Sequence, residues 1–348
     1  MPKRSGGTAG ARSRAIIGAM SGAAASSERP GPPGVGPARR GILAAAVLLG
    51  LSGCGIRLED DAPRLPLVPT RTPMAGEPDL VTFLRTTRAL AAALAGGDPV
   101  MAALAPLHRA QADVLDSALR RAGVPPAVID PVSSTSSSPP PDPPPDPPTD
   151  PATEPTTAAQ VARLEADSVT AAYGLLRSVG AELVPTLGAI AAQRAAGARA
   201  LDPGYRAAPP AGAGPLSASG ALPFLAATRQ AVYGIEVVAA RSGPAQRERA
   251  EAVLDRLRAL VRVQEESAGP SAPPTPLAYA LPLEVSDDDT GARLARTLLE
   301  RLTSAYAAQL APLAATRPAA LTATWWLVWS ARTAQRWGAP AAPFPGLE

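Results

Sequence analysis

Residues 83–88 read FLRTTR and residues 224–229 read FLAATR, so the chain repeats the pattern Phe-Leu-x-x-Thr-Arg at an interval of 141 residues. A second string, Val-Leu-Asp, occurs at residues 114–116 and again at 253–255, at an interval of 139. The two strings follow each other in the same order, and their intervals agree if the second copy lacks two residues between them. We therefore expect two copies of one structural unit in this chain.

The amino-acid composition indicates that this unit is helical. The chain has 348 residues, enough for two domains of ordinary size, and 46% of them are apolar. Alanine dominates the apolar residues, and aromatic residues make up only 3%. Ala, Leu and Val suit closely packed helices better than sheets, which favour β-branched and aromatic residues. We expect an all-α protein in which each unit has its own core.

Apolar residues recur at helical spacing in four stretches of each half. The Asp98-Pro99 pair is typical of a helix start, with Asp as the N-cap and Pro in the first turn. The sequence therefore predicts four long helices in each half. The stretches are residues 80–94, 104–119, 161–175 and 183–190 in the first half, and 225–235, 253–261, 294–302 and 321–328 in the second.

The lengths of the connections predict how these helices are joined. In each half the first and second helices, and the third and fourth, are joined by short turns, which makes them antiparallel neighbours. The second and third helices are joined by residues 124–157 in the first half and 268–287 in the second. A helix of ~20 residues is roughly 30 Å long, so about nine extended residues can cross a bundle from end to end. Two hairpins joined by one long crossover form a ferritin-like four-helix bundle.

These connections divide the chain into two bundles. We place the N-terminal four-helix bundle at residues 78–201, a linker at 202–216 and the C-terminal ferritin-like bundle at 217–348. A proline-rich crossover at residues 131–157 interrupts the first bundle, and its composition cannot form a core. This segment is either a tolerated surface insertion or a functional element, such as a ligand for a proline-binding domain or a spacer toward the cell wall.

The N-terminal region carries the features of an export signal. Residues 39–54 read RRGILAAAVLLGLSGC, in which a basic pair precedes an apolar run too short for a bilayer of roughly 30 Å. The small residues Ser52 and Gly53 then lead into the only cysteine. Leu51, Ser52, Gly53 and Cys54 resemble the bacterial lipobox, whose cysteine takes a diacylglycerol before cleavage on its N-terminal side.

We therefore expect a signal peptide at residues 1–53 and a tether at 54–77, both disordered. The lipid on Cys54 would anchor the protein to the outer face of the cytoplasmic membrane. The Arg39-Arg40 pair also resembles the twin-arginine export pattern, so the Sec and twin-arginine routes both remain open. Translation can start at Met1 or at Met20.

The charge balance argues against nucleic-acid binding. Residues 1–53 hold Lys3 and six arginines against Glu28 alone, so their removal turns 33 basic and 30 acidic residues into 26 and 29. A mature chain with a net charge of −3 has no positive field to attract a phosphate backbone. We expect no nucleic-acid partner.

The C-terminal half also resembles a known family. It contains AVYGIEVVAAR (231–241), LAYALPLEV (277–285), SAYAAQLAPLAA (304–315) and RWGAPAAPFPGLE (336–348). Residues 217–348 are similar to the actinobacterial ferritin-like domain of unknown function, which is found on exported lipoproteins. The segments from Tyr279 to Pro282 and from Phe344 to Gly346 are its most specific parts. The resemblance implies a fold and an exported location but no biochemical role. This chain departs from the family pattern at Arg229-Gln230, where relatives carry an acidic residue and a histidine.

Several chemistries are excluded by the residues that the chain lacks. A di-iron centre needs two Glu-x-x-His motifs, whereas the chain has one histidine, His108, with Ala105 in place of the glutamate. A Ser-His-Asp triad is impossible in the second bundle, which has no histidine, and lipidation consumes the thiol of Cys54. We expect no catalytic residue, cofactor or metal, and therefore no enzyme.

Other residues could carry a site but have simpler interpretations. Metal ligation by Glu236, Glu251 and Glu300 is conceivable, although helix surfaces carry such residues constantly. The Ser286–Asp289 run favours helix capping, because acidic groups stabilise the positive end of a helix. We interpret His108 as a histidine at the core boundary with a backbone or solvent partner, and a ligand or pH-sensing role is the alternative.

The tryptophans are the remaining candidates for a binding surface. All four lie between residues 325 and 337, and the adjacent Trp325 and Trp326 cannot both point inward. Trp325, Trp326 and Trp329 could line an apolar pocket or a partner surface, or the last helix could simply be the most buried one, packed against the first bundle. We expect a cell-envelope lipoprotein that binds or scaffolds a protein partner. The alternative is a carrier of a small apolar ligand near these tryptophans.

Overall fold

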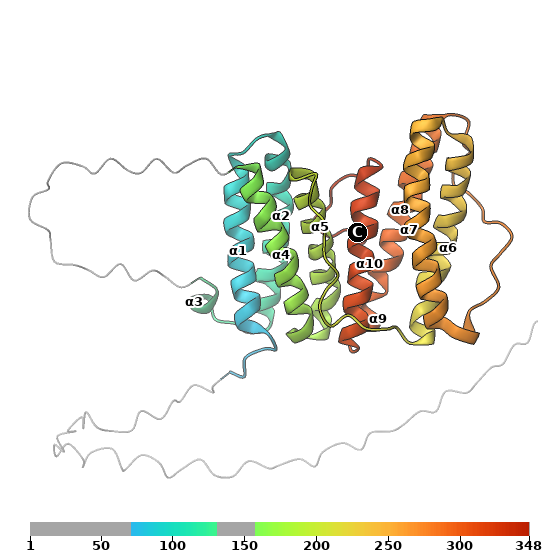
Figure 1. Ribbon diagram of the computed structural model, residues 1–348. Coiled ribbons are helices and arrows are strands. Elements are labelled where there is room, and N and C mark those ends of the chain that lie inside the picture. Colours follow the sequence, from blue (N-terminus) through green and yellow to red (C-terminus); the bar gives the residue numbers. More distant parts are fainter. Residues whose placement is uncertain (1–70, 131–156, 348) are drawn as a thin grey trace, which may run out of the picture. The chain divides into compact units, whose positions relative to one another are not determined.

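Helices account for all the regular structure that a computed structural model describes, which covers residues 71–130 and 157–347 (Figure 1). No strand occurs in these two ranges, so the all-α prediction is confirmed. The expected signal peptide, the lipobox with Cys54, residues 54–70 of the tether and residues 131–156 of the proline-rich crossover lie outside the described residues.

Four long helices make up the first half, joined as the connections predict. α1 (Glu77–Ala95) and α2 (Pro99–Arg121) form one hairpin, and α4 (Ala158–Ser178) and α5 (Val184–Leu201) form another. The short elements α3 (Pro126–Ile129) and η1 (Ala181–Leu183) precede α4 and α5. Asp98 caps α2 by accepting hydrogen bonds from two backbone N–H groups at 2.9 Å, as its position before Pro99 predicts.

The second half follows the same order. α6 (Ala218–Arg241) and α7 (Pro244–Ala268) form the first hairpin, and α8 (Asp288–Ala308) and α10 (Arg317–Arg336) form the second. The short elements η2 (Gly269–Ser271) and α9 (Leu310–Leu313) follow α7 and α8. The two halves thus share one order of hairpins, whereas their origin by duplication and their ferritin-like relationship stay predictions.

The long connection of the second half runs along the C-terminal half of α6. Near its start, the Pro273 carbonyl accepts a hydrogen bond from Arg229 at 2.7 Å, and near its end, the Val285 carbonyl accepts one from Arg241 at 3.1 Å. In the first half the same connection leaves beside Arg85, which donates to the Ile129 carbonyl at 3.0 Å. It returns at α4, whose Val161 packs beside Leu90 and Leu94 in the last turns of α1. Each half therefore has a crossover that joins opposite ends of its helices.

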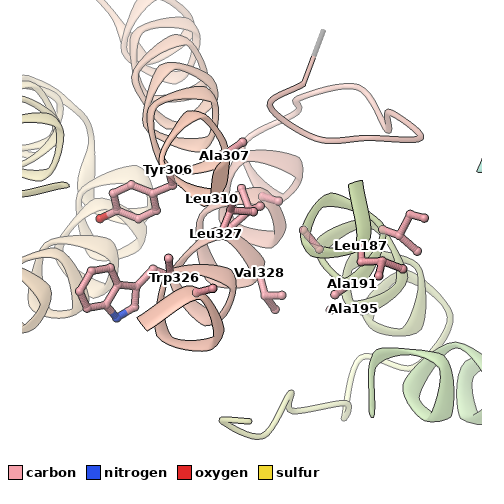
Figure 2. Close-up of a cluster of buried hydrophobic side chains, with 14 of the residues drawn as sticks. Leu187, Ala191, Ala195, Tyr306, Ala307, Leu310, Trp326, Leu327 and Val328 are labelled. Atoms are coloured by element: carbon pink, nitrogen blue, oxygen red, sulfur yellow. The ribbon is translucent and has the colours of Figure 1, made fainter. Parts of the chain in front are cut away.

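The expectation of one core per half is wrong. Most buried apolar residues of α1 through α10 form a single continuous cluster, because α5 of the first half packs against α10 of the second. In Figure 2, Leu187, Ala191 and Ala195 of α5 lie beside α9 and α10, which carry Leu310, Leu327 and Val328. The small alanines and Gly188 let the helices approach closely, since a Cβ at Gly188 would lie 2.5 Å from Leu310 Cδ1.

Residues 202–216 are packed along α10, although the sequence predicts only a linker there. The Gly214 N–H donates to the Pro318 carbonyl at 3.0 Å, and the Thr322 hydroxyl donates to the Gly214 carbonyl at 2.6 Å. At the other end of the segment, the Tyr205 ring lies 5.5 Å from the Arg332 guanidinium. This segment therefore contacts α10 near both of its ends. None of the helices in the described ranges is long and apolar enough to cross a bilayer.

Candidate functional site

A cluster of polar side chains lies inside the first half, with one residue from each long helix. We call Thr87, His108, Glu165 and Arg194, from α1, α2, α4 and α5, the polar core. His108 Nε2 lies 2.7 Å from Glu165 Oε1, and Arg194 Nη1 donates to Glu165 Oε2 at 3.3 Å. Arg194 Nη2 also donates to the Thr87 hydroxyl at 3.1 Å. Glu165, His108 and Arg194 are 0% exposed, so the ion pair is shielded from water.

Two glutamines and the C-terminal segment enclose this cluster. Gln111 Nε2 donates to Gln193 Oε1 at 2.9 Å and to the Pro343 carbonyl at 2.8 Å. The second bond joins α2 to a residue 232 positions later, so it fastens the C-terminal segment to the first half. Gly197 of α5 provides room for the carboxylate, because a Cβ there would lie 2.9 Å from Glu165 Oε1.

The electrostatics of the polar core favour a neutral histidine. Burial lowers the pKa of His108, and the nearby Arg194 charge lowers it further, while the bond to Glu165 acts in the opposite direction. Burial also lowers the pKa of Arg194, which Glu165 opposes. With Glu165 and Arg194 charged, a neutral His108 leaves the cluster without net charge. His108 Nδ1 has no hydrogen-bond partner within the described residues, which fits an unprotonated nitrogen there.

The interpretation of His108 as a boundary residue is therefore wrong. Its partner is the side chain of Glu165, 57 positions later, and neither the backbone nor solvent. The sequence contained one signal for this contact, because Glu165 lies four residues after Val161 and four before Val169, on the apolar face of α4. A charged side chain on that face has to be buried with a partner, or the face cannot pack into the apolar core.

A related but uncharged cluster lies inside the second half. The Thr228 hydroxyl of α6 lies 2.7 Å from the Tyr306 hydroxyl of α8, and Gln264 Nε2 of α7 donates to the same hydroxyl at 3.3 Å. Burial raises the pKa of Tyr306 to about 12, so the phenol stays protonated. The ring centroid of Phe224 lies 5.2 Å from that of Tyr306 and 5.2 Å from that of Trp326, and the Tyr306 and Trp326 centroids are 6.2 Å apart. This cluster links α6, α7 and α8 through neutral side chains.

The second repeated string does not mark equivalent positions. Arg88, the last residue of FLRTTR, pairs with Asp116 of Val-Leu-Asp at 2.8 Å. Its counterpart Arg229 pairs at 2.7 Å with Glu265, ten residues beyond Asp255 of the second Val-Leu-Asp. The first string thus repeats both a buried threonine and an ion-paired arginine, whereas the acidic partner comes from a different register of the following helix.

The tryptophans do not line one pocket. Trp326 is buried and points, with Tyr306, away from α5 (Figure 2), whereas Trp325 and Trp329 are half-buried. The adjacent pair is thus split between the core and its boundary, as predicted. Trp329 and Trp337 border a cavity of about 60 Å³, which also touches Arg249 and Arg336.

The acidic residues considered for metal binding are not brought together. Glu236 pairs with Arg258 at 2.9 Å, Glu251 is exposed on α7, and Glu300 lies on α8. Across residues 71–130 and 157–347, His, Cys, Asp and Glu side chains form no group of three or more that could hold a metal ion.

Asp287 caps α8 through a reciprocal pair of bonds with Thr290, as the capping interpretation predicts. These bonds lower the pKa of the Asp287 carboxyl. The next residue, Asp288, accepts a bond from the Gly243 N–H at 2.8 Å. The acidic run thus caps α8 and holds its start against the turn between α6 and α7.

An open groove of about 450 Å³ lies between α6, α7 and the crossover that follows α7. We call it the crossover groove. Its walls include Tyr233 and Tyr279, whose ring centroids are 5.7 Å apart, and the side chain of Leu277 is fully exposed at its edge. The full lining is Arg229, Val232, Tyr233, Glu236, Arg258, Val261, Arg262, Thr275, Pro276, Leu277 and Tyr279. The sequence signal for this groove was the Tyr-x-Leu-Pro segment, although the site was not expected there.

A comparison with known protein families finds a match for the C-terminal part of the chain. Residues 222–348 match a family described as "Domain of unknown function (DUF4439)". This range covers α7, α8, α10 and most of α6, and it contains the crossover groove but none of the polar core. No curated protein matches the chain. No solved structure matches it either.

Proposed function

We propose that this protein is an exported lipoprotein that binds or scaffolds a protein partner at the outer face of the cytoplasmic membrane, without a catalytic centre. The lipobox from Leu51 to Cys54 supports the anchor, since two or three acyl chains give stable attachment without a membrane-spanning helix. The sealed polar core also supports a structural role, because its charges are compensated and have no path to a substrate.

The crossover groove is the observation that carries the binding role. The fully exposed Leu277 is not isolated, because the groove also contains Val232, Val261 and two tyrosines, and a contiguous apolar surface of this kind is typical of a binding site. Tyrosines are common in protein interfaces because one end is apolar and the other forms hydrogen bonds. Arg258 is paired with Glu236, whereas Arg262 forms no ion pair with any described residue. We propose that an extended protein segment with apolar side chains and a carboxylate occupies this groove.

Crosslinking on membranes tests this role. A photoreactive residue in place of Leu277 should give one discrete crosslinked species, and Tyr279→Ala should remove it. The same reactive residue at Val128, which is exposed on α3 outside the matched domain, serves as the positional control. Val114→Asp, at an exposed site of α2, serves as the substitution control and should leave the species intact. Equal crosslinking from both positions, or none that depends on Tyr279, would reject the groove as a binding site.

The anchor is tested separately. Mass spectrometry of the mature N-terminal peptide should show a diacylglycerol on Cys54, and Cys54→Ala should release the protein from membranes. An unmodified cysteine in the membrane fraction would contradict the proposed lipid anchor and would leave the proposed binding site in the groove unaffected.

A carrier of small apolar ligands remains the alternative function. The cavity beside Trp329 is far smaller than the roughly 300–1,000 Å³ of typical ligand pockets, so it gives this role little support. A mostly apolar cavity of about 320 Å³ between α1 and α4 is better suited, with Phe83, Leu164 and Leu175 in its walls. Native mass spectrometry that finds a stoichiometric apolar ligand, lost on Leu164→Asp, would favour the carrier.

A further inference from the structure

Three arginines converge on one cavity at the join between the two halves. The cavity measures about 300 Å³ and lies between the C-terminal ends of α5 and α10. Arg199 comes from α5, and Arg332 and Arg336 come from α10. The other lining residues are Ala196, Ala200, Pro203 and Gln335, so no carboxylate borders the cavity. We call this the arginine pocket.

No carboxylate of the described residues pairs with the three arginines of the arginine pocket. Within residues 71–130 and 157–347, none of its three arginines lies within 4.0 Å of a carboxylate oxygen. Asp202 is the carboxylate nearest in sequence, and it accepts a hydrogen bond from the Gly204 N–H at 2.7 Å. The C-terminal ends of two helices contribute about half a negative charge each. About one negative charge therefore faces three positive ones, which leaves an excess of about two.

Two buried donors of this pocket also lack an acceptor. Arg199 Nη1 and Arg332 Nε are shielded from solvent and have no hydrogen-bond partner within the described residues. Unpaired buried donors are rare because each one loses its water without replacement. Burial lowers the pKa of Arg332, and the charges of Arg199 and Arg206 lower it further against the effect of Tyr205. These observations agree that positive charge has been placed here without a counter-charge.

The position of Arg332 is fixed before any ligand arrives. Its guanidinium lies over the Tyr205 ring at 5.5 Å from the centroid. Tyr205 belongs to a turn held by Arg206, whose Nη1 donates to the carbonyls of Pro203, Gly204 and Tyr205 at 3.1–3.2 Å. A guanidinium held in place loses less entropy when it binds an anion, which favours affinity.

We propose that the arginine pocket binds the phosphate group of a phosphate monoester. A dianion matches the excess charge of about two, and the planar forks of arginine bind phosphate oxygens in pairs. The cavity has room for a small organic group beside the phosphate. The ligand can be a soluble phosphate monoester or the headgroup of a monoester lipid such as phosphatidic acid, because both present the same dianion.

Titration calorimetry at constant ionic strength tests the proposal with the full-length protein. The probes are inorganic phosphate, glycerol 3-phosphate, and phosphatidylcholine vesicles with and without phosphatidic acid. Arg332→Gln and Arg199→Gln should each weaken binding at least tenfold, because each removes a positive charge and its hydrogen bonds to the phosphate. Arg109→Gln is the matched control, since it removes an exposed arginine of α2 that lies outside both proposed sites, and it should change affinity less than twofold.

Each outcome decides the question. Binding of the soluble probes assigns a soluble ligand, and binding only of vesicles that contain phosphatidic acid assigns a lipid headgroup. No binding of any probe, or binding that the three variants reduce equally, overturns the proposal. Circular dichroism checks that the variants fold, and the exposed Arg336→Gln replaces any variant that does not. These outcomes are independent of the crosslinking at Leu277, so either proposal can fail alone.

Discussion

The hydroxyls of Thr87 and Thr228, which are 141 residues apart, occupy the same position in the hydrogen-bond networks of their two halves. Each donates to the carbonyl of the phenylalanine four residues earlier, at 2.8 Å for Thr87 and 2.7 Å for Thr228. Each then accepts from a buried group on another helix, which is Arg194 at 3.1 Å in the first half and Tyr306 at 2.7 Å in the second. The Phe-Leu-x-x-Thr-Arg repeat therefore records a shared way of linking the first helix to its bundle.

Loss of the Thr228 hydroxyl should destabilise the second half. Thr228→Val keeps the shape of the side chain but leaves the Tyr306 hydroxyl with only the 3.3 Å contact to Gln264. We expect the free energy of unfolding to fall by about 1–3 kcal/mol, the usual cost of an unsatisfied buried polar group. Urea denaturation measures this change. Tyr306→Phe in the Thr228→Val background should recover part of the loss, whereas strictly additive effects would show that the two hydroxyls are not coupled.

Removal of Arg194 should be far more costly than removal of a surface arginine. Arg194→Met leaves the Glu165 carboxylate buried beside a neutral histidine, and we expect a loss of about 3–5 kcal/mol in the free energy of unfolding. Glu165→Gln added to Arg194→Met removes the unpaired charge and should restore much of the stability. The control is Arg258→Gln, whose pair with Glu236 is exposed at both ends and should contribute less than about 1 kcal/mol. Similar losses from Arg194→Met and Arg258→Gln would contradict the charge-burial argument.

Sequence reasoning found the helices because their signals are local. Apolar spacing located the long helices, and Asp98-Pro99 located the start of α2 at Pro99. The sequence of α5 does contain a signal for its burial. Its sequence, VPTLGAIAAQRAAGARAL, is apolar on all sides apart from Thr186, Gln193, Arg194 and Arg199, and a helix of that kind is buried on all sides. It therefore needed a second packing partner, which is α10.

The sites depend on contacts that no local pattern encodes. In the sequence Glu165 and Arg194 resemble ordinary surface charges. They meet only because the face of α4 that carries Glu165 packs against the face of α5 that carries Arg194. Arg199 and Arg332 are 133 positions apart and meet only because α5 and α10 pack side by side. Both clusters required the join between helices to be known first.

The stability of the protein should fall on acidification because of His108. Its pKa in the folded protein is lowered, so below about pH 6.5 the unfolded chain takes up a proton that the folded chain refuses. The contribution is therefore fully present above about pH 6.5 and is lost as the pH falls toward the folded pKa. One such proton changes the free energy of unfolding by at most about 1.4 kcal/mol per pH unit.

His108→Gln tests this dependence, because glutamine can still donate to Glu165 but does not titrate. Urea denaturation between pH 7.5 and 5 should show a shallower loss of stability for the variant than for the natural protein, and the two slopes should differ by at most about 1.4 kcal/mol per pH unit. Acidic groups with lowered pKa, such as Asp116 and Glu77, should cause the loss that both proteins share at lower pH. Identical slopes above pH 5 would mean that folding does not lower the pKa of His108.

Two glycines in helices should respond in opposite ways to the same substitution. Alanine normally stabilises a helix interior by up to about 1 kcal/mol relative to glycine, and Gly174→Ala in α4 should do so because nothing lies within 4 Å of the new Cβ. Gly197→Ala in α5 should instead destabilise by about 1–3 kcal/mol, since its Cβ would press on Glu165 Oε1 at 2.9 Å, where the carboxylate is held by both Arg194 and His108. Thermal and urea denaturation of the two variants measure the difference. If Gly197→Ala stabilised the protein as Gly174→Ala does, the carboxylate would be free to move, and the tight packing of the polar core would be refuted.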